Sequence, residues 1–169
     1  MELVQLNTMY DLSSFDCGDP DLNQFLRDDA LLFESQQIGK TFLLVDDMTV
    51  VAYFCLFNDK ISRLETQNNY WRKIKKKFPH AKHFNSYPAV KIGRFAVSSS
   101  YHNAGIGSEL MWSIKHLLNT GDSYSAFRFL TVDAYLSATA FYEKNGFRMM
   151  VADDDDRHTR LMFFDMMEL

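Results

Sequence analysis

The chain has 169 residues, enough for one domain that buries most of its apolar surface. Its hydrophobic content of 47% excludes a disordered chain, and its net charge of −4 argues against a protein built around nucleic acid. No apolar run reaches the length of a membrane span, and the N-terminus lacks the basic start of an export signal, so we expect a cytoplasmic protein. Cys17 and Cys55 lie far apart, which favours two reduced structural thiols over a disulfide or a metal site.

The N-terminal part predicts a strand, a helix and a β-hairpin, and an insert follows it. The strand is expected at 3–6, and a turn over 15–20 precedes a helix at about 21–33, capped by Asp19 or Asp21. The hairpin and the insert are predicted at these ranges: strands at 41–45 and 49–57, a turn at 46–48, and an insert at 58–86.

The stretch 91–118 predicts a strand that runs into a glycine turn and then a long amphipathic helix. The strand is expected at 92–97, and Gly121 with the two residues before it supplies a helix stop. Gly105 and Gly107 leave backbone N–H groups uncovered at the positive end of the helix dipole, where a phosphate is stabilised. One helix face is expected to be buried and the other exposed: Ile106, Leu110, Met111, Ile114, Leu117 and Leu118 inside, and Glu109, Lys115 and His116 outside.

Two common phosphate loops do not fit this turn. A nucleotide-triphosphate loop has Lys and then Ser or Thr after its last glycine, whereas Ser108 and Glu109 follow here. A dinucleotide-binding turn has a third glycine or alanine where this chain has Leu110.

The pattern that remains, residues 102–107 (His-Asn-Ala-Gly-Ile-Gly), resembles the acetyl-coenzyme A loop of the GNAT N-acetyltransferases. His102 takes the place of their usual Gln or Arg. A second stretch, 141–147 (Phe-Tyr-Glu-Lys-Asn-Gly-Phe), resembles the signature in which a short helix carries a tyrosine at the sulfur end of the cofactor. A strand is predicted at 127–132 and a helix at 136–144, which gives the expected order between the two stretches.

The resemblance implies one GNAT domain over residues 1–169, an α/β (α+β) fold with a mixed, mostly antiparallel central sheet and helices on both faces. It also implies an N-acetyltransferase that moves the acetyl group of acetyl-CoA, its cosubstrate, to a primary amine by direct attack in a ternary complex. Tyr142 would be catalytic, as the proton donor to the departing thiolate. Cofactor binding would fall to the end of the strand and to the loop: Phe95, Ala96, Val97, His102, Asn103, Ala104, Gly105, Ile106, Gly107 and Ser108.

The general base is not assigned. The strand before the loop offers only Lys91 and Arg94, and Asp133 is either a base acting through water or a helix cap. Tyr135 stands where many relatives carry an Asn, so the pantetheine contact of that Asn is not assigned either. An α-amino group, with a pKa of about 7.7–8.0, needs little help, which favours an α-amine acceptor over a lysine.

The acceptor stays open between a small molecule, a peptide and an aminoacyl-tRNA. Residues 15–18, 22–26 and 39–42 resemble a GNAT subgroup of toxins that acetylate aminoacyl-tRNA, or they mark a shared packing arrangement. A toxin would have an antitoxin partner, and a homodimer is compatible with the family. The alternative from another class is a coenzyme A-binding sensor or interaction module without turnover. No membrane partner and no metal are expected.

A basic segment and an acidic run complete the sequence. A helix predicted at 70–78 either contacts RNA phosphates or is a solvated amphipathic helix with Trp71, Ile74 and Phe78 packed inward. The run 153–156 predicts a solvated turn rather than a metal site, and 159–166 predicts a last strand. The basic segment gathers these side chains: Arg72, Lys73, Lys75, Lys76, Lys77, His80, Lys82 and His83.

Overall fold

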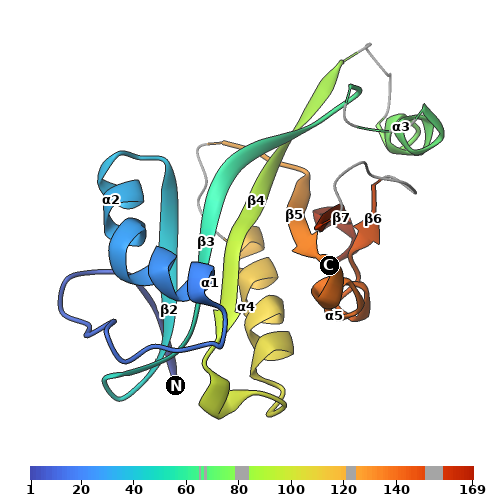
Figure 1. The fold of residues 1–169 in the computed structure, drawn as a ribbon. Helices are drawn as coiled ribbons and strands as arrows, with labels where there is room; N and C mark the ends of the chain where they lie inside the picture. Colours follow the sequence, from blue (N-terminus) through green and yellow to red (C-terminus); the bar gives the residue numbers. More distant parts are fainter. Residues whose placement is uncertain (65, 67, 79–83, 121–124, 151–157) are drawn as a thin grey trace. The chain divides into compact units, whose positions relative to one another are not determined.

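The computed structural model describes residues 1–64, 66, 68–78, 84–120, 125–150 and 158–169 (Figure 1). Its contacts divide the chain into two compact units. Unit 1 comprises Met1–Asn58 and Ile92–Leu118, and unit 2 comprises Asp59–Lys91 and Asn119–Leu169. That residues 1–169 form a single domain therefore stays a prediction.

Seven strands pair in the order β1-β2-β3-β4-β5-β7-β6. The pairs β1–β2, β2–β3, β5–β7 and β6–β7 are antiparallel. Helices accompany the strands in both units, so the predicted mixed α/β class is confirmed. The strand bounds are Glu2–Gln5 (β1), Gly39–Asp46 (β2), Thr49–Ser62 (β3), Ser86–Val97 (β4), Phe129–Tyr135 (β5), Arg148–Met149 (β6) and Thr159–Asp165 (β7).

In unit 1, the predicted N-terminal helix is present but is not uniform. Helix α1 (Pro20–Gln24) continues through a π-helical turn, Phe25–Asp29, into α2 (Ala30–Ser35). Asp19 caps it, because its carboxylate accepts hydrogen bonds from the backbone N–H groups of residue 21 at 2.9 Å and residue 22 at 3.2 Å. The prediction of Asp19 as the cap is thus confirmed. The alternative, Asp21, is wrong because Asp21 lies inside the helix.

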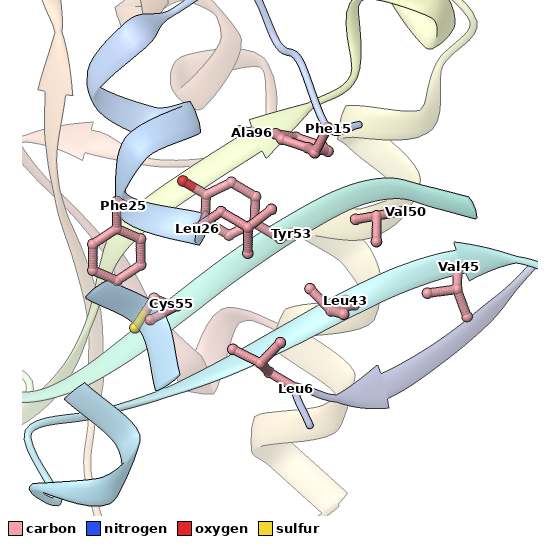
Figure 2. Close-up of a cluster of buried hydrophobic side chains, with 11 residues drawn as sticks. Leu6, Phe15, Phe25, Leu26, Leu43, Val45, Val50, Tyr53, Cys55 and Ala96 are labelled. Carbon is pink, nitrogen blue, oxygen red and sulfur yellow. The ribbon is translucent and has the colours of Figure 1, made fainter. Parts of the chain in front are cut away.

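The core of unit 1 lies between these helices and the strands β2 and β3 (Figure 2). Phe15 packs edge-on against Tyr53, with ring centroids 5.4 Å apart. Ala52 and Phe54 point to the opposite side of β3 and are also fully buried, so both faces of this strand are covered. The cluster consists of Leu6, Phe15, Phe25, Leu26, Ala30, Leu43, Val45, Val50, Tyr53, Cys55 and Ala96.

Helix α4 (Ile106–Thr120) lies behind β3 in the close-up, on the side away from α1 and α2 (Figure 2). Four of the six residues predicted to face inward are buried: Ile106, Leu110, Met111 and Ile114. Two predictions for this helix are wrong. Leu117 is 38% exposed, whereas Lys115, expected outside, is only 7% exposed. Lys115 lies four residues after Met111 and therefore follows it on the buried stripe.

Unit 2 contains the remaining helices, α3 (Asn68–Lys75) and α5 (Thr139–Lys144), and the short 3₁₀ turns Leu136–Ala138 and Met166–Glu168. Trp71 and Ile74 of α3 are buried and Phe78 is partly buried in the core of this unit, so the predicted inward face is confirmed. That core consists of Ile61, Trp71, Ile74, Tyr87, Ala89, Phe129, Met150 and Phe163.

Strands β3 and β4 are longer than predicted, because part of the predicted insert belongs to them. Asn58 and Lys60 are exposed while Ile61 is 1% exposed, and Tyr87 and Ala89 are buried on the other strand. Polar outward residues concealed this alternation in the sequence. The helix stop at Gly121, the run 153–156 and residues 80, 82 and 83 of the basic segment lie outside the described residues.

Within the part of the chain that the structure describes, no helix is long and apolar enough to cross a membrane. Both cysteines are free thiols, as expected.

Candidate functional site

The glycine turn of unit 1 has the backbone geometry of an anion-binding loop. Asn103 and Gly105 have left-handed φ angles of +62° and +84°, and α4 begins at the next residue, Ile106. The Gly105 carbonyl accepts hydrogen bonds from the N–H groups of Ser108 at 3.0 Å and Glu109 at 3.2 Å. The N–H groups of the residues just before Ser108, at the start of α4, have no carbonyl acceptor within the helix. They are therefore available to a ligand.

Gly105 also leaves space for a ligand. No heavy atom lies within 4 Å of the position that a Cβ would occupy on this residue. A side chain there would fill the open face and would be strained at a φ of +84°. The loop therefore fits a pyrophosphate of the kind that acetyl-CoA carries, bound through backbone amides.

His102, the departure from the usual loop pattern, is held by its own chain. Its ring nitrogen Nε2 lies 2.9 Å from the carbonyl oxygen of Val97. A carbonyl only accepts, so Nε2 is the protonated nitrogen. The ring ties the end of β4 to the start of the loop, and the backbone N–H of His102 donates to the Ser99 carbonyl at 3.3 Å, so both groups hold the loop in place.

The approach to the loop is hydrogen-bonded to the N-terminal turn. The N–H of Ser99 donates to the Asp16 carbonyl at 2.9 Å. The carboxylate of Asp16 accepts from the N–H of Gly18 at 2.8 Å and from Asn23 Nδ2 at 2.7 Å. The sequence predicts this turn before the N-terminal helix and relates it to a subgroup by resemblance, but it does not predict the contact with the loop. The structure assigns it a local role, since it supports the segment that leads into the loop.

The strand before the loop is buried or partly buried at its end. Ala96 is 5% exposed and belongs to the core of unit 1, while Phe95 and Val97 are half-buried. Arg94 is exposed, and its guanidinium carbon lies 5.0 Å from the centroid of the Phe25 ring. Only backbone contacts to a cofactor are therefore expected from Ala96.

Tyr142 lies on α5 in unit 2 and is 6% exposed. The rings of Phe141 and Phe147 meet it edge-on, with centroids 5.2 Å and 5.4 Å from its own. Burial raises the pKa of the phenol above its ordinary value, because a phenolate would lose its hydration. The hydroxyl thus stays protonated at neutral pH, as a proton donor requires.

Asp133 forms an ion pair with Lys91, with 2.7 Å between Oδ2 and Nζ. It lies within β5, and the residue before α5 is Ala138, so the predicted role as a helix cap is wrong. Next to this pair, the hydroxyl of Thr131 donates to Asp59 at 2.5 Å. Both pairs line a cavity of about 140 Å³ within unit 2. Sequence reasoning missed Asp59, because a single Asp in a predicted insert carries no signal.

The predicted site residues thus fall into two groups. All of the predicted cofactor-binding residues belong to unit 1, where the loop and the end of β4 are joined through His102 and Val97. Tyr142 and Asp133 belong to unit 2.

Comparison with known proteins agrees with this geometry. Residues 81–168 match the model of an acetyltransferase (GNAT) domain. The chain is 24% identical over 156 residues to a tRNA-acetylating toxin of Mycobacterium tuberculosis, which covers 92% of this chain and 87% of the toxin.

Solved structures share the fold. AtaT complexed with acetyl-methionyl-tRNAfMet is 23% identical, with a TM-score of 0.79 over 99% of this chain and 96% of that chain. A complex named AtaTR, bound with acetyl-CoA, is 23% identical, with a TM-score of 0.76 over 99% of this chain and 94% of that chain. A crystal structure of a bacterial toxin, 15% identical, has a TM-score of 0.81 over 99% of this chain and 92% of that chain.

The family model covers about half of the chain and includes the glycine loop and Tyr142. The chain belongs to the GNAT acetyltransferase family, and it is an acyltransferase that depends on acetyl-CoA.

Proposed function

We propose that the protein is a toxin-type N-acetyltransferase that acetylates the α-amino group of an aminoacyl-tRNA. The observation that carries this proposal is the likeness to a tRNA-acetylating toxin over 92% of the chain. A likeness of that extent reaches beyond residues 81–168 into the N-terminal half, where residues 15–18, 22–26 and 39–42 carry the subgroup resemblance.

The donor supplies an acetyl thioester, which a neutral amine attacks while the carbon–sulfur bond breaks and a thiolate leaves. The loop residues 102–108 form the pyrophosphate site, and the backbone N–H groups between His102 and Ser108 bind the pyrophosphate. The backbone N–H groups of residues 95–97 polarise the thioester carbonyl and stabilise the charge that develops on its oxygen. Tyr142 gives its phenolic proton to the departing thiolate.

The ion pair of Asp133 favours an acceptor that needs little deprotonation. The Asp133 oxygen Oδ2 is already bound to Lys91 Nζ at 2.7 Å, so it is not free to accept a proton from the amine. An α-amino group is substantially neutral near pH 8, whereas a lysine side chain, with a pKa of about 10.4, is almost fully protonated. An α-amine is therefore the acceptor that this chain needs to assist least.

The test is transfer of labelled acetyl from acetyl-CoA to a panel of acceptors. Charged tRNAs, free amino acids and a lysine-containing peptide would be compared at equal amine concentration. We expect label in the aminoacyl-tRNA fraction. The acetylated aminoacyl ester should resist the hydrolysis that an aminoacyl ester with a free amino group undergoes. Label only in the peptide or the free amino acids would overturn the proposal. The protein would then be an N-acetyltransferase with an acceptor other than aminoacyl-tRNA.

A toxin of this kind needs a partner that silences it. A tyrosine-to-phenylalanine variant of AtaT has been solved with the C-terminus of the antitoxin AtaR, at 22% identity and a TM-score of 0.74. We infer that this chain also has an antitoxin partner. Co-expression with the gene next to it should restore growth of cells that express this chain, and unchanged toxicity would count against it.

A further inference from the structure

We propose that one face of unit 2 binds the RNA phosphates of the acceptor, through a surface that begins in a hollow and continues along α3. The inference rests on the proposed function, which makes the substrate a polyanion. We name this the basic surface and define it by five side chains: Lys60, Arg63, Arg72, Lys73 and Lys76.

The structure divides the basic segment into an anchored charge and free charges. Lys77 is anchored, because its Nζ lies 2.6 Å from Asp165 Oδ2 and 2.7 Å from Glu168 Oε1. Asp165 also accepts from Arg128 at 2.5 Å, and Arg148 holds Glu168 at 2.5 Å. Lys77 is thus bound to carboxylates at the C-terminal end of unit 2 and is not available to RNA. The sequence did not distinguish it from the neighbouring lysines.

The free charges are the exposed cations of α3 and of the residue that follows it. Trp71 and Ile74 are 5% and 2% exposed, which fixes the inward face of α3. Arg72, Lys73 and Lys76 are exposed. Among the residues that the structure describes, none of these three cations has a carboxylate within ion-pair distance.

An aromatic ring accompanies these cations. Lys73 Nζ lies 5.4 Å from the centroid of the Tyr70 ring, one helical turn before it. The pair combines a phosphate-binding charge with a ring face of the kind on which unpaired bases stack.

A hollow of about 860 Å³ joins the start of α3. Asn68 is both the first residue of the helix and part of the lining, and Lys60 and Arg63 supply its charge. Its described lining has no carboxylate, although Glu65 lies outside the described residues. The lining consists of Lys60, Ser62, Arg63, Leu64, Thr66, Asn68, Asn85 and Ser86.

This chemistry suits RNA in particular. The amides of Asn68 and Asn85 and the hydroxyl of Ser86, which are exposed, can donate hydrogen bonds to phosphate and sugar oxygens, and such bonds position a nucleic acid without reading its sequence. The chain as a whole carries a net charge of −4, so a polyanion is repelled unless cations gather where it binds. An acidic protein could also bind these cations, and the test distinguishes binding of RNA from binding of such a protein.

The test is the salt dependence of tRNA binding, measured by fluorescence anisotropy with uncharged tRNA. Two variants remove the surface: Arg72→Glu with Lys73→Glu and Lys76→Glu, and Lys60→Gln with Arg63→Gln. We expect each variant to weaken binding at least 10-fold at low salt and to flatten the slope of log affinity against log salt by roughly 0.7–0.9 per lost phosphate contact. Acetyl-CoA affinity and the melting temperature should stay unchanged.

Two controls make the result specific. Lys40→Glu changes an exposed lysine of unit 1 and should leave the slope as it is in the wild type. Lys77→Ala should lower the melting temperature but keep the slope, whereas an equal loss of slope would overturn the division of charges.

The outcomes distinguish the surface from the proposed function. Wild-type protein that acetylates aminoacyl-tRNA, with variants of unchanged slope, would overturn the basic surface and keep the function. Variants that lose affinity for an acidic antitoxin while tRNA binding persists would likewise overturn it. Wild-type protein that binds tRNA through this surface but transfers no acetyl to aminoacyl-tRNA would overturn the function alone.

Discussion

The ring of Phe57 occupies the space beside Gly93, where a Cβ would lie 1.8 Å from Phe57 Cε2. The other edge of the ring meets Gly39, where a Cβ would lie 2.3 Å from Cε1. Gly39 is the register partner of Phe57 on β2. The glycines on β2 and β4 therefore make room for the ring of Phe57 on β3 between them, and β4 is the strand that leads to the cofactor loop.

Gly93→Ala should lower the free energy of unfolding by about 1–3 kcal/mol, the usual cost of overpacking. The ring cannot move aside toward Gly39, because it already fills that position as well. In a Phe57→Ala background the same substitution should cost less than in the wild type. Denaturant unfolding of the four proteins of this cycle measures the difference, and an equal cost in both backgrounds would contradict the contact.

Gly107→Val should abolish acetyl-CoA binding while the fold survives. The residue lies in the first turn of α4, where a branched side chain would stand between the ligand and the backbone N–H groups. Ser113→Val is the matched control, since it places the same side chain on the same helix away from the loop. Calorimetry should show binding for the control only. Unchanged affinity in a folded Gly107→Val protein would remove the loop from the cofactor site.

Tyr142→Phe should reduce turnover by roughly 10²- to 10⁴-fold, the range that general acid catalysis supplies. The substitution keeps the ring that packs against Phe141 and Phe147 and removes only the hydroxyl. Acetyl-CoA affinity should change little, because the loop is untouched. Thiol release and a binding titration on the same variant measure the two quantities, and wild-type turnover in the variant would exclude Tyr142 as the proton donor.

Stability should fall in acid through Asp165 and Glu168. Burial alone would raise the pKa of Asp165, but hydrogen bonds from Arg128 and Lys77 outweigh it and hold the pKa below its ordinary value. The hydrogen bond from Lys77 lowers the pKa of Glu168 in the same way. A carboxylate whose pKa is lower in the folded state stabilises the fold above its unfolded pKa, which is about 4, and loses this effect as the pH falls through the folded value.

Asp165→Asn should therefore flatten the loss of stability below about pH 4. At neutral pH it should cost about 3 kcal/mol, the low end for breaking a buried pair, since Lys77 and Arg128 keep contact with water. Asp28→Asn removes an exposed carboxylate outside the network and serves as the control. Thermal unfolding from pH 2 to 7 checks both variants, and parallel curves for Asp165→Asn and wild type would contradict the linkage.

Features that depend on neighbouring residues could be predicted from the amino-acid sequence. The cap by Asp19 is formed with N–H groups two and three residues away, and the loop needs left-handed backbone at Gly105 directly before a helix. Such features follow from local hydrogen bonds and steric limits, so a short stretch of sequence is enough to predict them. The family resemblance arose from the same short stretches.

Contacts between charged residues that are far apart in the chain could not be predicted, because they arise from the folding of the whole chain. Lys77 and Asp165 are 88 residues apart, and Lys91 and Asp133 are 42 apart. The position of a charged residue on a predicted helix face does not reveal a distant partner, so Lys77 looked equivalent to Lys76 in the sequence. Strand pairing extended β3 and β4 through polar residues in the same way, because hydrogen bonds of a sheet join backbones whatever side chains they carry.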